Sequence, residues 1–310
     1  MFETILVALE SSAMDDSLLN QVVRLARRED VHLALAHVVH PSEGEEYGEA
    51  SDQPLPLRVK AAKRRLEASE ERLTDQGLSA SSRVVLGDPA ERILELAEEV
   101  EASAIALATH GRSGPRRWLE GSVTESVLRG TKVPVLVINP SHARKGQASG
   151  FKRILVPLDG SERALRILPS VRRFALLYDA EVTLLRVGIH PSVHFHEISA
   201  GVGTAPMAPL RESLAQSLTQ AAQALPGVKN VSTRVMFSDT ASAGVLEALQ
   251  SESYDLVALG THGRSGLDRL LFGSTAEAVA RDCPVPLLVY RDLELKTESQ
   301  ADEASSGTHA

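Results

Sequence analysis

The chain has 310 residues, enough for two ordinary domains that each bury a core of their own. Its residues are 43% hydrophobic and 24% charged, as in folded globular proteins, and no window approaches the ~20 apolar residues of a membrane-spanning helix. A net charge of −8 argues against a nucleic-acid-binding protein, which usually carries an electropositive surface. Cys283 is the single cysteine, and the N-terminus lacks the basic region and apolar run of a signal peptide, so we expect a cytoplasmic protein.

In the first half of the chain, short β-rich runs alternate with helical stretches. Strands are expected at 4–9, 31–39, 80–86, 103–109 and 133–138, and helices at 13–29, 57–77, 89–100 and 121–130. Gly77 is expected as a helix C-cap glycine, and Asp88-Pro89 as a helix start with Pro89 in the first position. Several strand runs are continuously apolar, which is typical of parallel strands covered by helices on both faces. The alternation predicts a doubly wound α/β domain with a parallel five-stranded sheet.

The second half repeats this scheme, with strands expected at 152–158, 180–187, 231–237, 255–261 and 285–290. The hexapeptide THGRSG occurs at 109–114 and again, 152 residues later, at 261–266. The same offset relates VPVLV at 133–137 to VPLLV at 285–289, and ILVALE at 5–10 corresponds to ILVPLD at 154–159. A repeat over the whole chain indicates a tandem duplication. We predict one domain at 1–140, a linker at 141–150, a second domain at 151–291 and a disordered acidic tail at 292–310.

The repeated hexapeptide follows the expected fourth strand of each domain, and a Gly-Ser pair then opens the next helix. In the second copy, Gly263 and Gly266 allow the backbone to approach a ligand closely. The backbone N–H groups of residues 273–275 stand at a helix start, where an anion is favoured, and Arg264 supplies a positive charge. These features predict a cradle for a polyphosphate, although the lysine and the spacing of a P-loop are absent.

The loop after the first strand of each domain carries an acid. If the strand order is 3-2-1-4-5, this loop faces the hexapeptide across the crevice where the strand order reverses, which is the usual ligand site of such sheets. Asp159 stands there in the second domain and Glu10 in the first. An aspartate can bind a ribose hydroxyl, an exocyclic amine or a metal carried by the phosphates, and the sequence leaves these alternatives open.

Together the two motifs resemble the universal stress protein family of the UspA type, over nearly the whole chain apart from the linker and the tail. The resemblance implies that each domain has a flavodoxin-like, Rossmann-like α/β fold with strand order 3-2-1-4-5. It also implies ATP binding through Gly-x2-Gly-x9-Gly-Ser/Thr after strand 4 and an aspartate after strand 1. The second domain matches this pattern, whereas the first has Ala108 in place of the first glycine and Glu10 in place of the aspartate.

We therefore expect an adenine nucleotide site in each domain, with ATP, alone or with Mg²⁺, as the ligand. In the second domain the expected binding residues are Pro157, Leu158, Asp159, Gly260, Thr261, His262, Gly263, Arg264, Gly266, Gly273, Ser274 and Thr275. In the first domain they are Ala8, Leu9, Glu10, Ala108, Gly111, Arg112, Gly114, Gly121, Ser122 and Val123. We assign no catalytic residue and no metal ligand.

The last strands, 133–138 and 285–290, are apolar edge strands in this topology, and bare apolar edges invite pairing. The resemblance implies that two such domains pair through this strand. A tandem chain can pair them internally as a pseudo-dimer, and a further homodimer is left open.

The sequence contains no nucleophile–base constellation and no metal-ligand set, which favours a regulatory, stress-response binding protein with an unidentified protein partner over an enzyme. One alternative is a slow Mg²⁺-dependent nucleotide hydrolase or transferase that uses Asp159. Another is an interaction module that binds no nucleotide. Turnover measurements separate the first two hypotheses, and nucleotide binding separates both from the third.

Overall fold

The computed structural model describes residues 2–10, 14–27, 30–41, 54–109, 123–140, 150–189, 207–261 and 273–291. The first half contains β1 (Thr4–Ala8), α1 (Asp15–Ala26), β2 (His32–Val39), α2 (Leu55–Asp75), β3 (Ser79–Leu86), α3 (Pro89–Glu99), β4 (Ala104–Ala108), α4 (Val123–Gly130) and β5 (Val135–Ile138). The second contains β6 (Arg153–Pro157), α5 (Glu162–Leu165), α6 (Leu168–Tyr178), β7 (Glu181–Ile189), α7 (Met207–Ala222), β8 (Val231–Ser238), α8 (Ala241–Ser251), β9 (Leu256–Gly260), α9 (Ser274–Asp282) and β10 (Leu287–Tyr290). The expected tail, and the expected linker apart from Gly150, lie outside the described residues.

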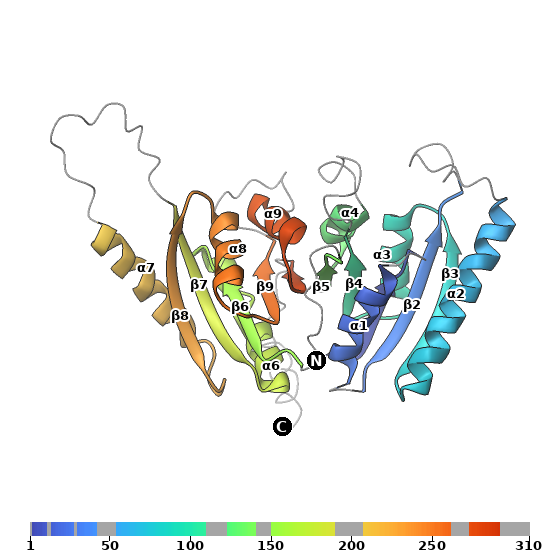
Figure 1. Ribbon diagram of the computed structural model, residues 1–310, viewed down its shortest axis with the longest axis horizontal. Coiled ribbons are helices and arrows are strands. Elements are labelled where there is room, and N and C mark those ends of the chain that lie inside the picture. Colours follow the sequence, from blue (N-terminus) through green and yellow to red (C-terminus); the bar gives the residue numbers. More distant parts are fainter. Residues whose placement is uncertain are drawn as a thin grey trace, which may run out of the picture.

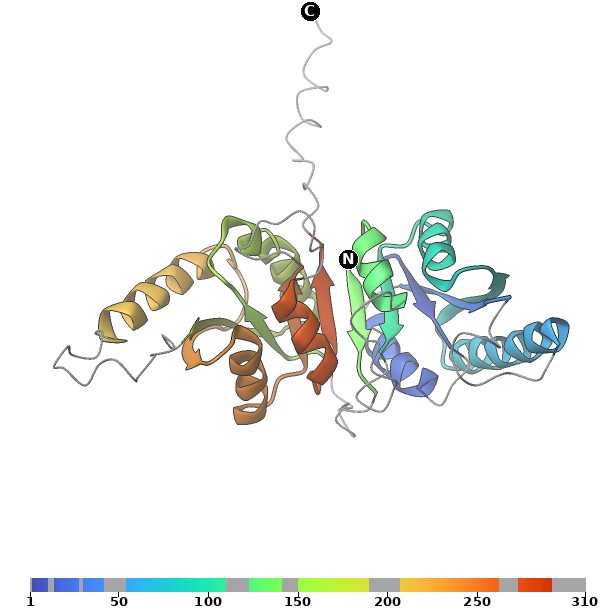
Figure 2. The ribbon, with the colours of Figure 1, turned by 90° about the horizontal axis from the view of Figure 1, so that it is seen from above.

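The strands form one continuous sheet in the order β3-β2-β1-β4-β5-β10-β9-β6-β7-β8. Within each half neighbouring strands are parallel, so the expected order 3-2-1-4-5 is confirmed twice. The two halves join where β5 and β10 pair antiparallel, with Leu136 opposite Leu288. Figures 1 and 2 show the halves side by side with these two strands in the middle. The expected internal pairing through the last strands is therefore confirmed, and it turns the two five-stranded sheets into a single ten-stranded mixed sheet.

Helices cover both faces of this sheet because side chains alternate along each strand. One buried cluster holds Ile5 and Val7 with side chains of α1, α2, α6 and α7. The other holds Leu6 with side chains of α3, α4, α8 and α9. The predicted doubly wound α/β architecture is confirmed. None of the helices in the described ranges is long and apolar enough to span a bilayer.

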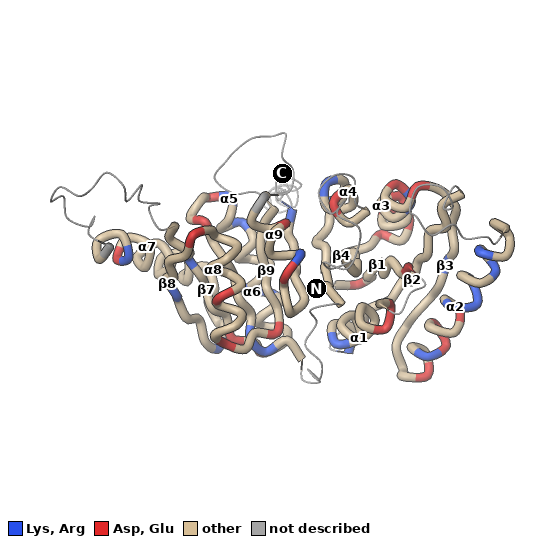
Figure 3. Tube along the Cα trace, turned by 45° about the horizontal axis from the view of Figure 1, so that its top comes forward, with Lys and Arg blue, Asp and Glu red and all other residues tan. Residues whose placement is uncertain are grey.

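Two helix boundaries follow directly from local sequence. The Asp88 carboxylate accepts hydrogen bonds from the backbone N–H groups of Ala90 (2.9 Å) and Glu91 (3.0 Å), and so caps α3 as expected. Gly77 follows the end of α2 with φ of +79°, the left-handed conformation that glycine adopts most easily. The outward face of α2 carries basic positions in its first half and acidic positions mainly after them (Figure 3). Lys63 and Glu67 pair along this face at 3.6 Å.

Contacts between the halves extend beyond the two paired strands. The Tyr178 hydroxyl of α6 donates to the carbonyl of Leu25 in α1 at 2.8 Å. The guanidinium of Arg24 lies 4.4 Å from the ring centre of Phe151, where the second half begins. Arg291, which follows β10, donates to the carbonyl of Thr131 before β5 at 2.8 Å. These contacts fix the two halves relative to each other.

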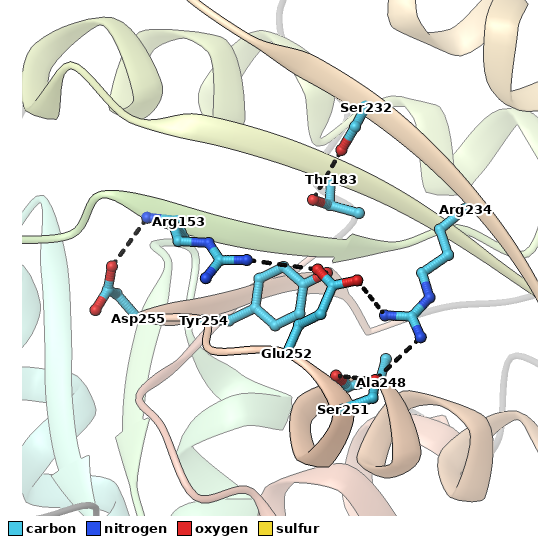
Figure 4. A network of polar contacts seen from close by, with 9 residues as sticks. All are labelled: Arg153, Thr183, Ser232, Arg234, Ala248, Ser251, Glu252, Tyr254 and Asp255. Atoms are coloured by element: carbon cyan, nitrogen blue, oxygen red, sulfur yellow. Dashed lines mark hydrogen bonds and ion pairs between the residues drawn. The ribbon is translucent and has the colours of Figure 1, made fainter.

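A polar network anchors the amino end of β6, the strand whose other end carries Asp159 (Figure 4). The Asp255 carboxylate accepts hydrogen bonds from the backbone N–H groups of Lys152 (3.0 Å) and Arg153 (2.9 Å). The Arg153 guanidinium lies 5.4 Å from the ring centre of Tyr254 and 3.4 Å from the Glu252 carboxylate. The start of β6 is therefore held firmly to the residues that precede β9.

Candidate functional site

The candidate sites lie at the carboxyl ends of the strands that meet where the strand order reverses. The second site is formed by the ends of β6 and β9, and the first site by the ends of β1 and β4. In an open α/β sheet this is where ligands bind. The loops expected to hold the nucleotide thus begin on neighbouring strands in both halves.

The hydrogen-bonded pairing between the two strands of the second site is shorter than that of the first. β1 and β4 pair over four residues, from Ile5 to Ala8, whereas β6 and β9 pair only at Ile154 and Leu155. The N–H of Leu158 points to β7, where it donates to the carbonyl of Leu185 at 2.8 Å. Because donors alternate between the two sides of a strand, the nitrogen of Pro157 faces β9, and proline has no N–H to donate. Pro157 stands where the first half has Ala8, so one sequence difference accounts for the shorter pairing at the second site.

Asp159 has one carboxylate oxygen occupied and one available. Its Oδ1 accepts from the Ser161 backbone N–H at 2.9 Å and from the Ser161 hydroxyl at 2.6 Å. The hydroxyl oxygen of Ser161 in turn accepts from the N–H of Ala164 and caps α5. Oδ2 is buried and has no hydrogen-bond partner among the described residues. A buried carboxylate oxygen without a donor is unfavourable, so this atom suits a donor group on a ligand.

Glu10 occupies the corresponding position in the first site. Its side chain is exposed, and its backbone N–H donates to the Asp15 carboxylate at 3.0 Å. Asp15 is the first residue of α1, so the backbone at the end of β1 is bonded to an acid of the following helix. The two acids therefore differ in exposure and in these hydrogen bonds: Glu10 is exposed, whereas Asp159 is half-buried and bonded to Ser161.

Gly260 and Gly273 differ in whether the fold has room for a Cβ at their positions. Gly260 does not have a positive φ, so its backbone conformation does not require glycine. A Cβ at Gly260 would lie 3.6 Å from Ile167 and 3.9 Å from the Tyr290 carbonyl, which are ordinary contacts. A Cβ at Gly273 would lie only 2.9 Å from the carbonyl oxygen of Thr261, closer than real Cβ contacts. The fold needs glycine at 273, whereas the glycine at 260 leaves room at the end of β9.

A backbone hydrogen bond joins Thr261, which follows β9, to Gly273, which precedes α9. Thr261 is buried, and its N–H donates to the carbonyl of Tyr290 at 2.9 Å. Its own carbonyl accepts from the N–H of Gly273 at 2.8 Å. Gly273 then caps α9, which starts at Ser274 as the Gly-Ser pair predicts, with Thr275 as its second residue. The helix start expected to hold phosphate is thus fixed beside the end of β9.

Several expected site residues lie outside the described residues, namely His262, Gly263, Arg264, Gly266, Gly111, Arg112, Gly114, Gly121 and Ser122. The others fall where the sequence placed them relative to the strands and helices. At or just after the ends of β6 and β9 stand Pro157, Leu158, Asp159, Gly260 and Thr261, and at those of β1 and β4 stand Ala8, Leu9, Glu10 and Ala108. Val123 is the first residue of α4.

Comparison with known proteins identifies the family. The sequence model described as the Universal stress protein family matches residues 1–139 and 150–291. The chain belongs to the universal stress protein family.

Individual relatives agree with this membership. The universal stress protein Rv2005c of Mycobacterium tuberculosis is 30% identical over 225 residues, which cover 70% of each chain. A universal stress protein structure from Archaeoglobus fulgidus superposes with a TM-score of 0.66 at 20% identity, covering 94% of this chain and 98% of that one. A putative universal stress protein from Pseudomonas aeruginosa gives 0.64 at 16% identity, covering 94% and 93%. The two structures share the fold of the whole tandem chain.

This universal stress protein has two residues near its sites that the sequence motifs do not reveal. Arg186 of β7 is only 5% exposed, and its Nη1 donates to the carbonyl of Leu158 at 3.1 Å. At the equivalent place in β2, Nδ1 of His37 lies 2.7 Å from the carbonyl of Leu9 and donates to it. A charged residue within the apolar run expected at 180–187 was the available signal for Arg186.

Tyr290 also lies beside the second site, because it is paired with Gly260 in the sheet register. Its side chain is 7% exposed, and its hydroxyl has no hydrogen-bond partner within the described ranges. Burial raises the pKa of this phenol well above its ordinary value, so the side chain is neutral at physiological pH.

Proposed function

We propose that this universal stress protein binds adenine nucleotide, ATP alone or with Mg²⁺, at the second site and acts as a regulatory stress-response protein. The observation that carries the proposal is the buried Oδ2 of Asp159, which has no donor among the described residues. The 6-amino group of adenine and the ribose hydroxyls are both donors of the kind that this oxygen requires. Membership of the family supports the same ligand class.

The neighbourhood of Asp159 fits such a ligand. Gly260 leaves space at the end of β9 that the fold does not use, and Pro157 keeps β6 from pairing with β9 at this level. The bond from Gly273 to Thr261 places the start of α9 beside the same strand ends. The N–H of Gly273 is used in this bond, so the N–H groups of residues 274 and 275 are the ones that would favour phosphate. Mg²⁺ would come with the phosphates, since the described ranges hold no group of three or more His, Cys, Asp or Glu side chains suited to a metal.

We propose that the first site takes the same ligand more weakly. β1 and β4 remain paired up to Ala8, and Ala108 replaces the glycine at the end of β4. The exposed Glu10 offers no buried acceptor equivalent to Oδ2 of Asp159. The second site would therefore fill first in a titration.

Calorimetric titration of the full chain with Mg-ATP tests the proposal through Gly260→Ala. The added methyl group meets only ordinary contacts within the protein, so we expect an unchanged unfolding midpoint. In the ligand site the same methyl group crowds the nucleotide, and overpacking of this kind weakens binding about tenfold or more.

Gly150→Ala is the matched control, because a Cβ there has nothing within 4 Å and the position is remote from both sites. It should bind ATP as the wild type does. Wild-type affinity in Gly260→Ala would contradict the assignment of the second site. Phosphate release under saturating ATP checks that the protein binds rather than turns over its ligand, and sustained turnover at ordinary enzyme rates of ~1–10³ s⁻¹ would contradict a purely regulatory role.

A further inference from the structure

The loop that carries Asp159 rests on the buried side chain of Arg186. Nη1 of Arg186 donates to the carbonyl of Leu158 at 3.1 Å, just before the aspartate. Just after it, Gly160 packs directly against the guanidinium, because a Cβ at this glycine would lie 2.7 Å from Nη1 and 2.8 Å from Cζ. Gly160 has φ of +75°, so the chain turns sharply there in a conformation that side chains disfavour. Arg186 thus contacts the loop on both sides of Asp159.

Different residues stand at the equivalent positions of the first half. His37 replaces Arg186, and its single ring nitrogen Nδ1 supports the carbonyl of Leu9. In the aligned sequences Ser11 replaces Gly160, a position outside the described residues. Arginine thus accompanies glycine in the second half, and histidine accompanies serine in the first. In the second half the guanidinium occupies the space that a Cβ at position 160 would fill.

We propose that Arg186 and Gly160 form a matched pair that positions Asp159 for the nucleotide, with Arg186 acting as a positioning residue. The proposal rests on the nucleotide-binding function proposed for the second site. Arginine suits the task because its planar guanidinium offers several donors in fixed directions and keeps its charge at all physiological pH values. A loop held in its bound conformation loses less entropy when the ligand binds, so affinity rises.

Binding and stability should respond differently when Arg186 is replaced. Removing a buried charge lifts a desolvation penalty, which opposes the loss of the hydrogen bond at the Leu158 carbonyl and of the other contacts of this side chain. The unfolding midpoint of Arg186→Met reports the net effect of these losses on stability, separately from binding. The loop loses its support on both sides of Asp159, so we expect ATP affinity to fall about tenfold. If Arg186 had only a structural role, its replacement would lower ATP affinity only as far as it lowers the stability of the fold.

The experiment titrates the full chain with Mg-ATP and measures thermal unfolding of the same samples. Arg186→His, which copies the solution of the first half, should recover part of the affinity that Arg186→Met loses. Arg234→Met is the matched control. This arginine of β8 stands opposite Leu185 in the register, so its side chain lies on the other face of the sheet from Arg186, where it pairs with Glu252. It should bind ATP as the wild type does. Wild-type affinity in Arg186→Met, or an Arg186→His variant as weak as Arg186→Met, would overturn the proposal.

A second arm tests the pair without nucleotide. Gly160→Ala introduces backbone strain in any background, but it meets the guanidinium only when residue 186 is arginine. The substitution should therefore lower the unfolding midpoint more in the wild type than in Arg186→His, and this non-additivity measures the pairing. Additive effects would refute the matched pair. If the wild type binds no ATP while the effects are non-additive, the proposed function fails and the structural pairing stands.

Discussion

Tyr290 offers a test of the packing beside the second site, because it buries a hydroxyl without a partner in the described part of the chain. Its counterpart in the first half is the apolar Ile138 of β5, so the position does not require a polar group. Tyr290→Phe removes the hydroxyl and keeps the ring. Relief of a buried unsatisfied polar group is worth about 1–3 kcal/mol in favour of the folded state. A gain of this size raises the unfolding midpoint by roughly 2–4 °C per kcal/mol in domains of 150–250 residues.

Thermal unfolding without nucleotide, at pH 7 and at alkaline pH, provides the assay. Because burial raises the pKa of Tyr290 above that of the unfolded chain, the unfolded phenol ionises first, near pH ~10. The ionisation of Tyr290 therefore leaves the free energy of unfolding unchanged below that pH and lowers it as the pH rises further. Tyr290→Phe should lack this alkaline loss. A variant that is less stable than the wild type at pH 7 would refute the reasoning, because it would mean that the hydroxyl has a partner.

Two further substitutions test contacts around α9. Burial, followed by the charge of Glu125, raises the pKa of Glu277. The ionised side chain therefore opposes folding at pH values above its ordinary titration range. Thermal unfolding should show Glu277→Gln to be more stable than the wild type at neutral pH and equally stable below pH ~4. An equal midpoint at pH 7 would contradict this. Gly273→Ala places a Cβ 2.9 Å from the Thr261 carbonyl and should lower the unfolding midpoint, whereas Gly260→Ala should not; equal midpoints for the two variants would contradict the distinction between these glycines.

Much of the fold follows from patterns that are visible in the sequence. Repeated strings separated by a near-constant offset indicate two copies of one domain, and alternating apolar runs indicate a parallel sheet. Asp88 and Gly77 mark helix ends through short-range chemistry that the chain carries locally. The internal pairing of the last strands required the family resemblance in addition, because pairing between distant strands leaves no local signature.

The site is less predictable because its properties arise from contacts between distant residues. Gly260 and Gly273 belong to one motif, and the sequence assigns both to the ligand. Only the position of the Thr261 carbonyl separates a glycine that closes the loop from one that leaves room. Pro157 is visible in the sequence, but its effect depends on which neighbouring strand its nitrogen faces.

Arg186 illustrates the same limit. An arginine in an apolar strand is a visible irregularity, yet the sequence does not say which loop its side chain reaches. Its contacts with Leu158 and Gly160 exist because β7 lies next to β6 in the sheet. Residues that position a site through a neighbouring strand therefore escape motif analysis, which follows the chain rather than the sheet.

The central claim is that Asp159 presents an acceptor to an adenine nucleotide at the second site. Titration of the nucleotide-free full chain with Mg-ATP, in the wild type and in Asp159→Asn, tests it most directly. Asparagine can keep the bonds that Ser161 donates, but it turns an NH₂ donor toward the ligand in place of the free oxygen. The account predicts a tight binding phase in the wild type that is lost in Asp159→Asn. No binding to the wild type at millimolar ATP, or an undiminished tight phase in Asp159→Asn, would contradict it.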